Sequence, residues 1–314
     1  MMKRFLAAVL STLLLLTVGC GSESQPKDAK LSKLTIGLMP DTDSIPFIIA
    51  AEHGYFAEEG VEVELVPFKS AMERDAALQS ANIDGAVSDL LAVIFARSGG
   101  FAVHAVSYTD GNYNLVAGGS AGIASSADLR GKEIAISRNT IIEYVTDEIL
   151  AVNGIEEQNV SKVVIPQIPV RLEMLQSGNL AAAVLPEPMA SVAVASGSRY
   201  VTGSEELGIN PGVIVFADAS VRDKADSIRA MYRAYDKAVS YLNNTPRADY
   251  IDLVMEKSGF PAPARDALQL KPYRSAGLPA EQDVAEAVHW VKSKDLAGEY
   301  SYDDLVSKLL TEGQ

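Results

Sequence analysis

One ten-residue phrase occurs twice in this sequence. LQSANIDGAV (Leu78–Val87) and LQSGNLAAAV (Leu175–Val184) agree at six of ten positions without a gap. Two flanking pairs match in the same order: VEVELVP with VSKVVIP, and TIGLMPDT with EIAISRNT. The three offsets are 97, 99 and 98 residues. Because three matches in one order at nearly one offset are hard to obtain by chance, we infer a duplicated unit, with one copy in each of two lobes.

Each copy alternates predicted strands with predicted helices. In the first copy LTIGLM, VEVELVPF and IDGAVSD have strand patterns, and AMERDAALQSA has helical composition. In the second copy a capping box begins at Thr140, and an apolar stripe at helical spacing stops at Gly154. Such alternation is typical of parallel sheets covered by helices. We therefore predict an α/β fold of two lobes, each a mostly parallel sheet with helices on both faces, and a ligand cleft between the lobes.

The cleft residues should follow the repeated strands, because ligands of open α/β sheets bind at the carboxyl edge of the strands. In the first copy this edge carries PDTDS, which includes Asp41, Thr42, Asp43 and Ser44, and then Ser88 and Asp89. In the second copy it carries Ser137, Arg138, Asn139 and Thr140, and then Glu187. Ordinary turn and cap chemistry would place the same residue types there.

The first twenty residues have the pattern of a secretory signal. Two basic residues precede an apolar run from Phe5 to Val18, too short for a typical membrane-spanning helix. Gly19 and Cys20 resemble a bacterial lipobox, although Thr17 stands where leucine is usual. This resemblance implies a signal peptide at 1–19, lipid on Cys20 and a polar tether at 20–32. A cleaved signal that leaves an unmodified thiol is the alternative. Cys20 is the only cysteine, so an intramolecular disulfide is excluded.

Four stretches together resemble a known family: PFIIAAEHGYFAEEGVEVELV, LQSANIDGAVSD, ADLRGKEIAI and AAAVLPEP. The sequence is similar to the solute-binding proteins of ABC importers for nitrate, sulfonates, taurine and thiamine-pyrimidine precursors. The resemblance implies the two-lobed periplasmic-binding-protein fold, with the chain crossing between lobes near 110–115 and 211–217. Lobe 1 would contain 33–109 and 215–314, and lobe 2 would contain 110–214. The later helical part, with Ile228, Met231, Tyr235, Val239 and Leu242 at helical spacing, would pack back on lobe 1.

The charge pattern bears on the ligand. A net charge of −14 argues against nucleic acid as a partner. Near the predicted cleft, five acids (Asp41, Asp43, Asp89, Asp110 and Glu187) stand against one evident cation, Arg138, which would bind an anionic group or pair with an acid. This count favours a nitrogenous solute over a sulfonate. Phe47, Tyr113, Tyr108 and Tyr144 offer flat walls for a ring or, alternatively, core packing.

The sequence gives weaker support to an enzymatic function than to a binding function. GGSAG matches a serine-hydrolase pattern around Ser120, but a short polar segment follows it where a helix is needed. The three histidines have no close ligand spacing, so we expect no metal and no cofactor. We predict a membrane-anchored, extracytoplasmic binding protein that serves an ABC permease. An enzyme on the same fold, like those of the menaquinone pathway, and a sensor partner are the alternatives.

Overall fold

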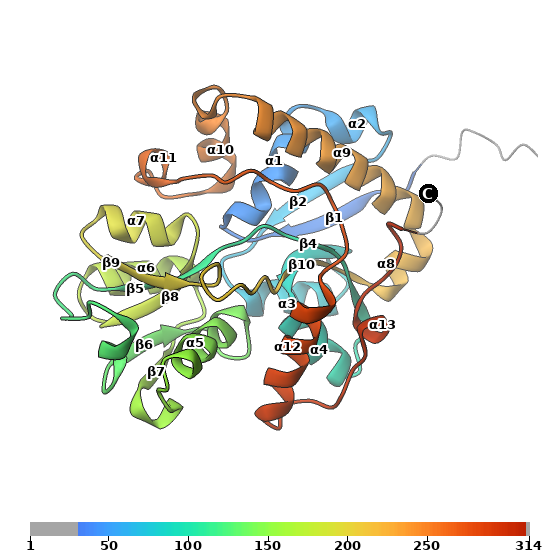
Figure 1. The fold of residues 1–314 in the computed structure, drawn as a ribbon. Helices are drawn as coiled ribbons and strands as arrows, with labels where there is room; N and C mark the ends of the chain where they lie inside the picture. Colours follow the sequence, from blue (N-terminus) through green and yellow to red (C-terminus); the bar gives the residue numbers. More distant parts are fainter. Residues whose placement is uncertain (1–30, 312–314) are drawn as a thin grey trace, which may run out of the picture. The chain divides into compact units, whose positions relative to one another are not determined.

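The computed structural model describes residues 31–311. The predicted signal peptide, Cys20 and the tether up to residue 30 lie outside the described residues. The described chain forms one compact unit with two five-stranded sheets (Figure 1). The strands of the first sheet, in spatial order, are β2 (Val63–Pro67), β1 (Leu34–Leu38), β3 (Gly85–Asp89), β10 (Gly212–Ala217) and β4 (Val103–Tyr108). Those of the second are β7 (Ser161–Val164), β6 (Glu133–Ile136), β8 (Ala182–Pro186), β5 (Tyr113–Ala117) and β9 (Arg199–Gly203).

The two sheets repeat one topology, as the duplication predicts. In the first, β1 is parallel to both β2 and β3, and in the second β6 is parallel to both β7 and β8. The fourth strand is antiparallel in each sheet, β10 beside β3 and β5 beside β8. Both antiparallel strands also carry a register shift against their outer neighbour. The prediction of two α/β lobes with mostly parallel sheets is therefore confirmed.

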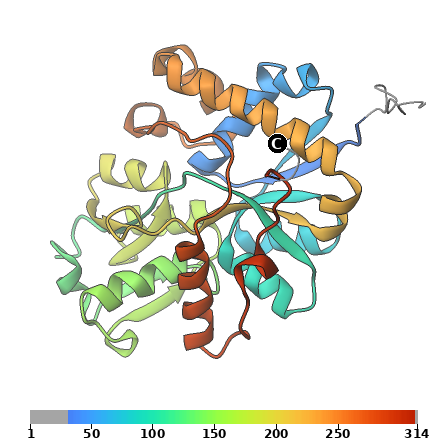
Figure 2. The ribbon, with the colours of Figure 1, turned by 45° about the vertical axis from the view of Figure 1, so that its right-hand side comes forward.

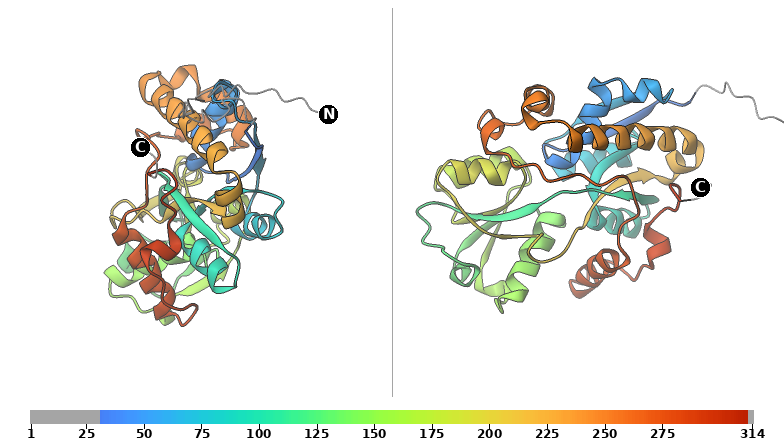
Figure 3. Two further views of the ribbon diagram at one scale, coloured as in Figure 1. Left: turned by 90° about the vertical axis from the view of Figure 1, so that its right-hand side faces the viewer. Right: turned by 45° about the horizontal axis from the view of Figure 1, so that its top comes forward.

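The antiparallel strands mark where the chain passes between the sheets. After β4 the chain enters the second sheet as β5, and after β9 it returns to the first sheet as β10. Figure 3 shows these two passages lying beside one another. The return strand begins at Gly212, so Gly212–Ile214 belong to the first sheet, slightly before the boundary predicted at 214/215.

Helices cover both sheets. Those of the first part of the chain are α1 (Ile45–Glu52), α2 (Tyr55–Glu58), α3 (Ala71–Gln79) and α4 (Leu90–Ser98). Those that alternate with the strands of the second sheet are α5 (Ile141–Val152), α6 (Ile168–Gln176) and α7 (Met189–Ala195). The later helices are α8 (Asp218–Asp223), α9 (Ala225–Asn244), α10 (Ile251–Ser258), α11 (Ala264–Ala267), α12 (Glu281–Ser293) and α13 (Tyr302–Leu305). Short 3₁₀ turns occupy Thr42–Ser44, Ser126–Leu129, Glu157–Asn159 and Arg247–Asp249.

The long helix α9 packs back on the first lobe. Its predicted apolar stripe is buried against α1 and α2, and the rings of Phe47 and Tyr235 lie 5.0 Å apart. The later helix α12 lies between α4 and α5 (Figure 2). From α12, Trp290 donates a hydrogen bond from Nε1 to Asp147 Oδ2 of α5 at 3.1 Å. The C-terminal part of the chain thus contacts both lobes.

Caps at the strand ends define where the functional edge begins. Asp89 ends β3 and caps α4, accepting a hydrogen bond from the Ala92 amide at 2.9 Å. Thr140 caps α5 by accepting from the Ile142 amide, while Glu143 accepts from the Asn139 amide. Helix α5 then ends at Val152, just before Gly154, whose positive φ of 60° suits glycine. The sequence prediction of this helix is confirmed.

Candidate ligand-binding site

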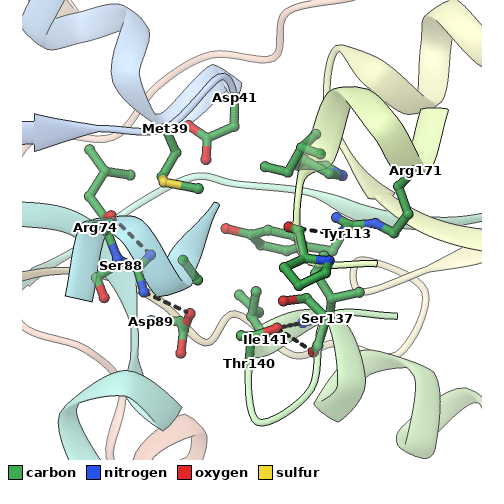
Figure 4. Close-up of a pocket in the computed structure, with 16 residues that line it drawn as sticks. Met39, Asp41, Arg74, Ser88, Asp89, Tyr113, Ser137, Thr140, Ile141 and Arg171 are labelled. Carbon is green, nitrogen blue, oxygen red and sulfur yellow. Dashed lines mark hydrogen bonds and ion pairs between the residues drawn. The ribbon is translucent and has the colours of Figure 1, made fainter. Parts of the chain in front are cut away.

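A small cavity lies between the carboxyl edges of the two sheets (Figure 4). Its volume is about 40 Å³, little more than the roughly 30 Å³ that one water molecule occupies in the liquid. We call it the inner cavity. It is lined by Met39, Asp41, Ala71, Arg74, Val87, Ser88, Asp89, Tyr113, Ser137, Thr140, Ile141, Ile142, Pro166, Ile168, Arg171 and Pro186.

The two copies of the repeat line the inner cavity with equivalent positions. At the repeat offsets of 97 and 98 residues, four lining residues of the first copy correspond to four lining residues of the second. These pairs are Met39 with Ser137, Ala71 with Ile168, Arg74 with Arg171, and Asp89 with Pro186. The duplication therefore builds the cavity as well as the sheets, with one wall from each copy.

The pair formed by Arg74 and Arg171 is the most unusual of the four, because both guanidinium groups are buried. Arg74 donates from Nη1 to Val87 O at 3.2 Å, and Arg171 donates from Nε to Val184 O at 3.1 Å. The two acceptors are themselves equivalent in the repeat. Each arginine therefore anchors itself to the third strand of its own sheet, and Figure 4 shows the two on opposite walls.

Of the two acids in the PDTDS turn, Asp41 belongs to the first wall and Asp43 lies outside the lining of the inner cavity. Asp41 lines the inner cavity and is 5% exposed. Burial raises the pKa of Asp41 to about 6, against the stabilising hydrogen bond from Ser44. Asp43 is also buried, and burial together with the neighbouring Asp41 raises the pKa of Asp43 well above its ordinary value. Asp43 accepts a hydrogen bond from the Tyr113 hydroxyl of β5 at 3.1 Å, so this contact joins the two lobes.

Asp89 and Ser88 complete the first wall. Burial raises the pKa of Asp89, although Arg74, whose Nη2 lies 3.8 Å from Asp89 Oδ2, opposes that rise. Among the described residues, the hydroxyl of Ser88 is buried without a hydrogen-bond partner, as are Nη2 of Arg74 and Nη2 of Arg171. Buried polar atoms are costly when they have no partner. These three donors could be satisfied by a ligand in the cavity.

A larger groove opens beside the inner cavity and shares Ser137, Thr140 and Pro166 with it. We call it the outer groove; its volume is about 480 Å³. Arg138 and Asn139 line the outer groove, together with apolar side chains of α3 and α4 such as Met72 and Phe95. Arg138 does not line the inner cavity, so it is not the cation of that site.

Three of the predicted residues lie in a separate hollow, the hinge hollow, which is lined by Thr42, Asp110, Asn112, Asn114, Glu187, Ser191, Tyr200, Glu205, Gln269, Leu270, Lys271 and Tyr273. Asp110 pairs there with Arg274 at 2.5 Å, and Glu187 accepts from Asn114 Nδ2 at 2.7 Å. The amide of Thr42 donates to Glu187 O at 3.0 Å, so this hollow also joins the lobes. Both acids line this hollow and neither lines the inner cavity, which is the physical reason they do not contribute charge to that cavity.

The remaining predicted residues make turn or packing contacts within the fold. Ser44 donates to Met39 O at 2.8 Å and so fixes the turn after β1. Phe47 has no exposed surface and packs against Tyr235. Tyr144 packs edge-on against Trp290, and Tyr108 lies under the guanidinium of Arg274, 3.9 Å from its carbon to the ring centre. Of the four aromatic candidates, only Tyr113 lines the inner cavity.

The charge count drawn from the sequence is corrected by this arrangement. The inner cavity contains two acids, Asp41 and Asp89, and two arginines, Arg74 and Arg171. Sequence reasoning missed both arginines because it predicts cleft residues at the ends of strands, whereas these residues lie on the helices α3 and α6. A signal was present: the repeat extends upstream as RDAALQS and RLEMLQS, with arginine at the same step.

Among the described residues no group of three or more histidine, cysteine, aspartate or glutamate side chains is arranged to hold a metal ion. No helix in the part of the chain that the structure describes has the length and apolar character needed to cross a bilayer.

Solved structures share this architecture. The ligand-binding component of an ABC-type import system from Staphylococcus aureus aligns with a TM-score of 0.77 at 17% identity, covering 90% of this chain and 99% of that one. The alkanesulfonate-binding protein SsuA from Xanthomonas axonopodis pv. citri gives 0.74 at 17% identity, covering 87% and 96%. The CA3427 gene product of Candida albicans, described as having the generic periplasmic-binding-protein fold, gives 0.68 at 14% identity, covering 88% and 97%.

These likenesses, with the two repeated sheets and the cavity between them, define a protein of the periplasmic-binding-protein fold. A comparison with curated protein sequences found no match. The family model described as NMT1/THI5 like matches residues 41–249, which include every lining residue of the inner cavity except Met39. The chain belongs to the NMT1/THI5-like family.

Proposed function

We propose that this protein is the solute-binding component of an ABC importer, which captures a small organic solute between its lobes and delivers it to a membrane permease. The observation that carries this proposal is the inner cavity, because equivalent residues of both repeat copies form its two walls and leave buried donors without partners. The Staphylococcus aureus and Xanthomonas neighbours, which are named as binding proteins, support it.

The mechanism follows from the size of the cavity. An organic solute needs more room than about 40 Å³, so the lobes must separate to admit it and close around it. Contacts that form only on closure then stabilise the closed form. Interlobe hydrogen bonds would break on opening, among them Tyr113 to Asp43, Trp290 to Asp147 and the Thr42 amide to Glu187 O. The two passages between the sheets would act as the hinge.

The proposal includes an extracytoplasmic location with a lipid anchor on Cys20. A flexible polar tether, 20–32, would hold the binding unit near the permease. Each sheet would move with its covering helices, so that lobe 1 comprises 33–109 and the chain from Gly212 onward, and lobe 2 the residues between them. A sensor that presents the solute to a receptor would use the same cavity with a different membrane partner.

The solute is proposed to carry N–H groups, as the nitrogenous compounds favoured above do. Asp41 and Asp89 line the inner cavity, and buried carboxylates are best stabilised by donors. Binding rather than catalysis is supported by the Staphylococcus aureus and Xanthomonas neighbours, which are named as binding proteins. Ser120 of the hydrolase-like pattern lies in an exposed turn after β5, apart from the cavity.

A thermal-shift screen of taurine, alkanesulfonates, nitrate, aminopyrimidines and small amines tests the proposal. We expect one class to stabilise the protein saturably, and Asp89→Asn to weaken that binding tenfold or more. Asparagine still caps α4, so the melting temperature without solute should change little.

Glu187→Gln is the matched control, because Glu187 is a buried acid of the hinge hollow, outside the inner cavity. The affinity of the Glu187→Gln variant for the stabilising solute should stay within about twofold of that of the wild type. Disruption of the gene should also abolish cellular uptake of the stabilising solute. Unchanged uptake, or full affinity in Asp89→Asn with loss in Glu187→Gln, would contradict the proposal.

A further inference from the structure

Arg171 is a buried cation with no acidic partner among the described residues. It has no exposed surface, and its bonds go to backbone carbonyls: Nε to Val184 O, and Nη1 to Ile165 O at 2.8 Å and Pro166 O at 3.3 Å. Carbonyl dipoles orient the guanidinium but do not neutralise it. Burial accordingly lowers the pKa of Arg171 to about 10. A buried charge without a counter-charge is costly.

The equivalent Arg74 is neutralised. Its Nε donates to Asp75 Oδ1 at 2.8 Å, and its Nη2 lies 3.8 Å from Asp89. The two arginines thus share a place in the repeat but differ in charge balance. The second copy has Leu172 where the first has Asp75, and Pro186 where the first has Asp89. The first wall is neutral or acidic, and the second wall is positive.

The free donor of Arg171 faces the inner cavity. Nη1 and Nε are occupied by carbonyls, whereas Nη2 is buried without a partner, and Arg171 lines the cavity. Ser137, also buried, lines the same wall (Figure 4). An oxyanion placed there would accept from Nη2 and supply the missing negative charge.

We infer that the solute has an oxyanionic group, such as a sulfonate, carboxylate or phosphate ester, and that Arg171 binds it on the second wall. The inference rests on the proposed function and adds an orientation to it. The anionic end faces Arg171, and the N–H end faces Asp41 and Asp89 of the first wall. The cavity therefore selects a bipolar solute over a simple amine or a simple anion.

Inorganic sulfate is the probe, because it presents the oxyanion alone. We expect sulfate to stabilise the wild-type protein saturably, relative to chloride at equal ionic strength. Arg171→Gln should weaken that response tenfold or more, and Arg171→Lys should retain part of it. Arg130→Gln is the control, since Arg130 is an exposed arginine of the same lobe that also donates to a carbonyl, Gly154 O. An equal response in Arg171→Gln and the wild type would overturn the inference.

A second measurement needs no variant, in case Arg171→Gln does not fold. Crystals of the wild-type protein soaked in selenate should show an anomalous peak in the inner cavity beside Arg171. Selenate found only at other places would overturn the inference. A negative result in the sulfate or the selenate experiment would rule out only the assignment of an anionic group to Arg171. Failure of the proposed function would instead appear as the absence of any stabilising organic solute in the screen.

Discussion

Asp41→Asn should raise the stability of the solute-free protein above pH 7 by about 3 kcal/mol. Burial raises the pKa of Asp41 to about 6, whereas in the unfolded chain an aspartate titrates near 3.9. Folding therefore favours the protonated carboxyl, and stability is lost as the pH rises from about 4 to about 6. Asparagine stays uncharged throughout, so this loss should disappear in the variant.

Thermal unfolding from pH 4 to pH 8 measures this effect. The wild type should lose stability across the interval, while Asp41→Asn should give a flatter profile and bind solute more weakly. Asp226→Asn, at an aspartate whose side chain is 83% exposed, serves as control and should follow the wild type. A variant that is less stable at pH 8 and keeps the wild-type slope would show that Asp41 is satisfied as a carboxylate within the fold.

Gly85→Ala should cost about 3 kcal/mol of folding free energy. A Cβ at Gly85 would lie 2.6 Å from the ring of Phe216 and 2.7 Å from Val215 O on the neighbouring strand β10. In the second copy the equivalent residue is already Ala182, and it faces Ala117 on β5. In the first sheet the Phe216 ring fills the space beside Gly85. In the second sheet the methyl groups of Ala182 and Ala117 fill the equivalent space.

Urea denaturation of single and double variants tests this exchange. Phe216→Ala alone should cost about 3–5 kcal/mol through the cavity it leaves. The double variant should cost at least 1 kcal/mol less than the sum of the two. Gly99→Ala, where the nearest contacts are an ordinary 3.4 Å, should have little effect. Simple additivity in the double variant would mean that the two residues do not share that space.

Much of the fold could be predicted because the strand–helix unit is repeated in the sequence. The repeated strands, the helix capped at Thr140 and the buried stripe of α9 are local patterns, and each is where the pattern placed it. The strand that returns to the first sheet begins at Gly212, earlier than the lobe boundary predicted at 214/215. The sequence did not show this start because β10 is antiparallel and lies outside the duplicated strand–helix block. No strand-to-helix turn marks its start.

The candidate site was predicted only in part. Residues directly at strand ends, such as Asp41, Asp89 and Ser137, line the inner cavity, and their role in binding a ligand stays a prediction. Arg74 and Arg171 reach the inner cavity from helices. A helical sequence does not by itself show which side chains face a ligand cavity, and the two arginines stand out only when the repeat is extended upstream to include them. Asp110 and Glu187 also follow strands, but Arg274 and Asn114, which pair with them, lie 164 and 73 residues away along the chain. Such long-range pairing is invisible to local patterns.

Native mass spectrometry of the protein isolated from its own host tests the central claim most directly, namely that the inner cavity captures a solute. The wild-type protein should carry a small molecule that is released on denaturation. Ala71→Phe, which fills the cavity from α3, should carry none, while the control Ala57→Phe, at an exposed position of α2, should carry the same molecule as the wild type. A wild-type protein that never carries a solute, or a solute retained in full by Ala71→Phe, would contradict the account.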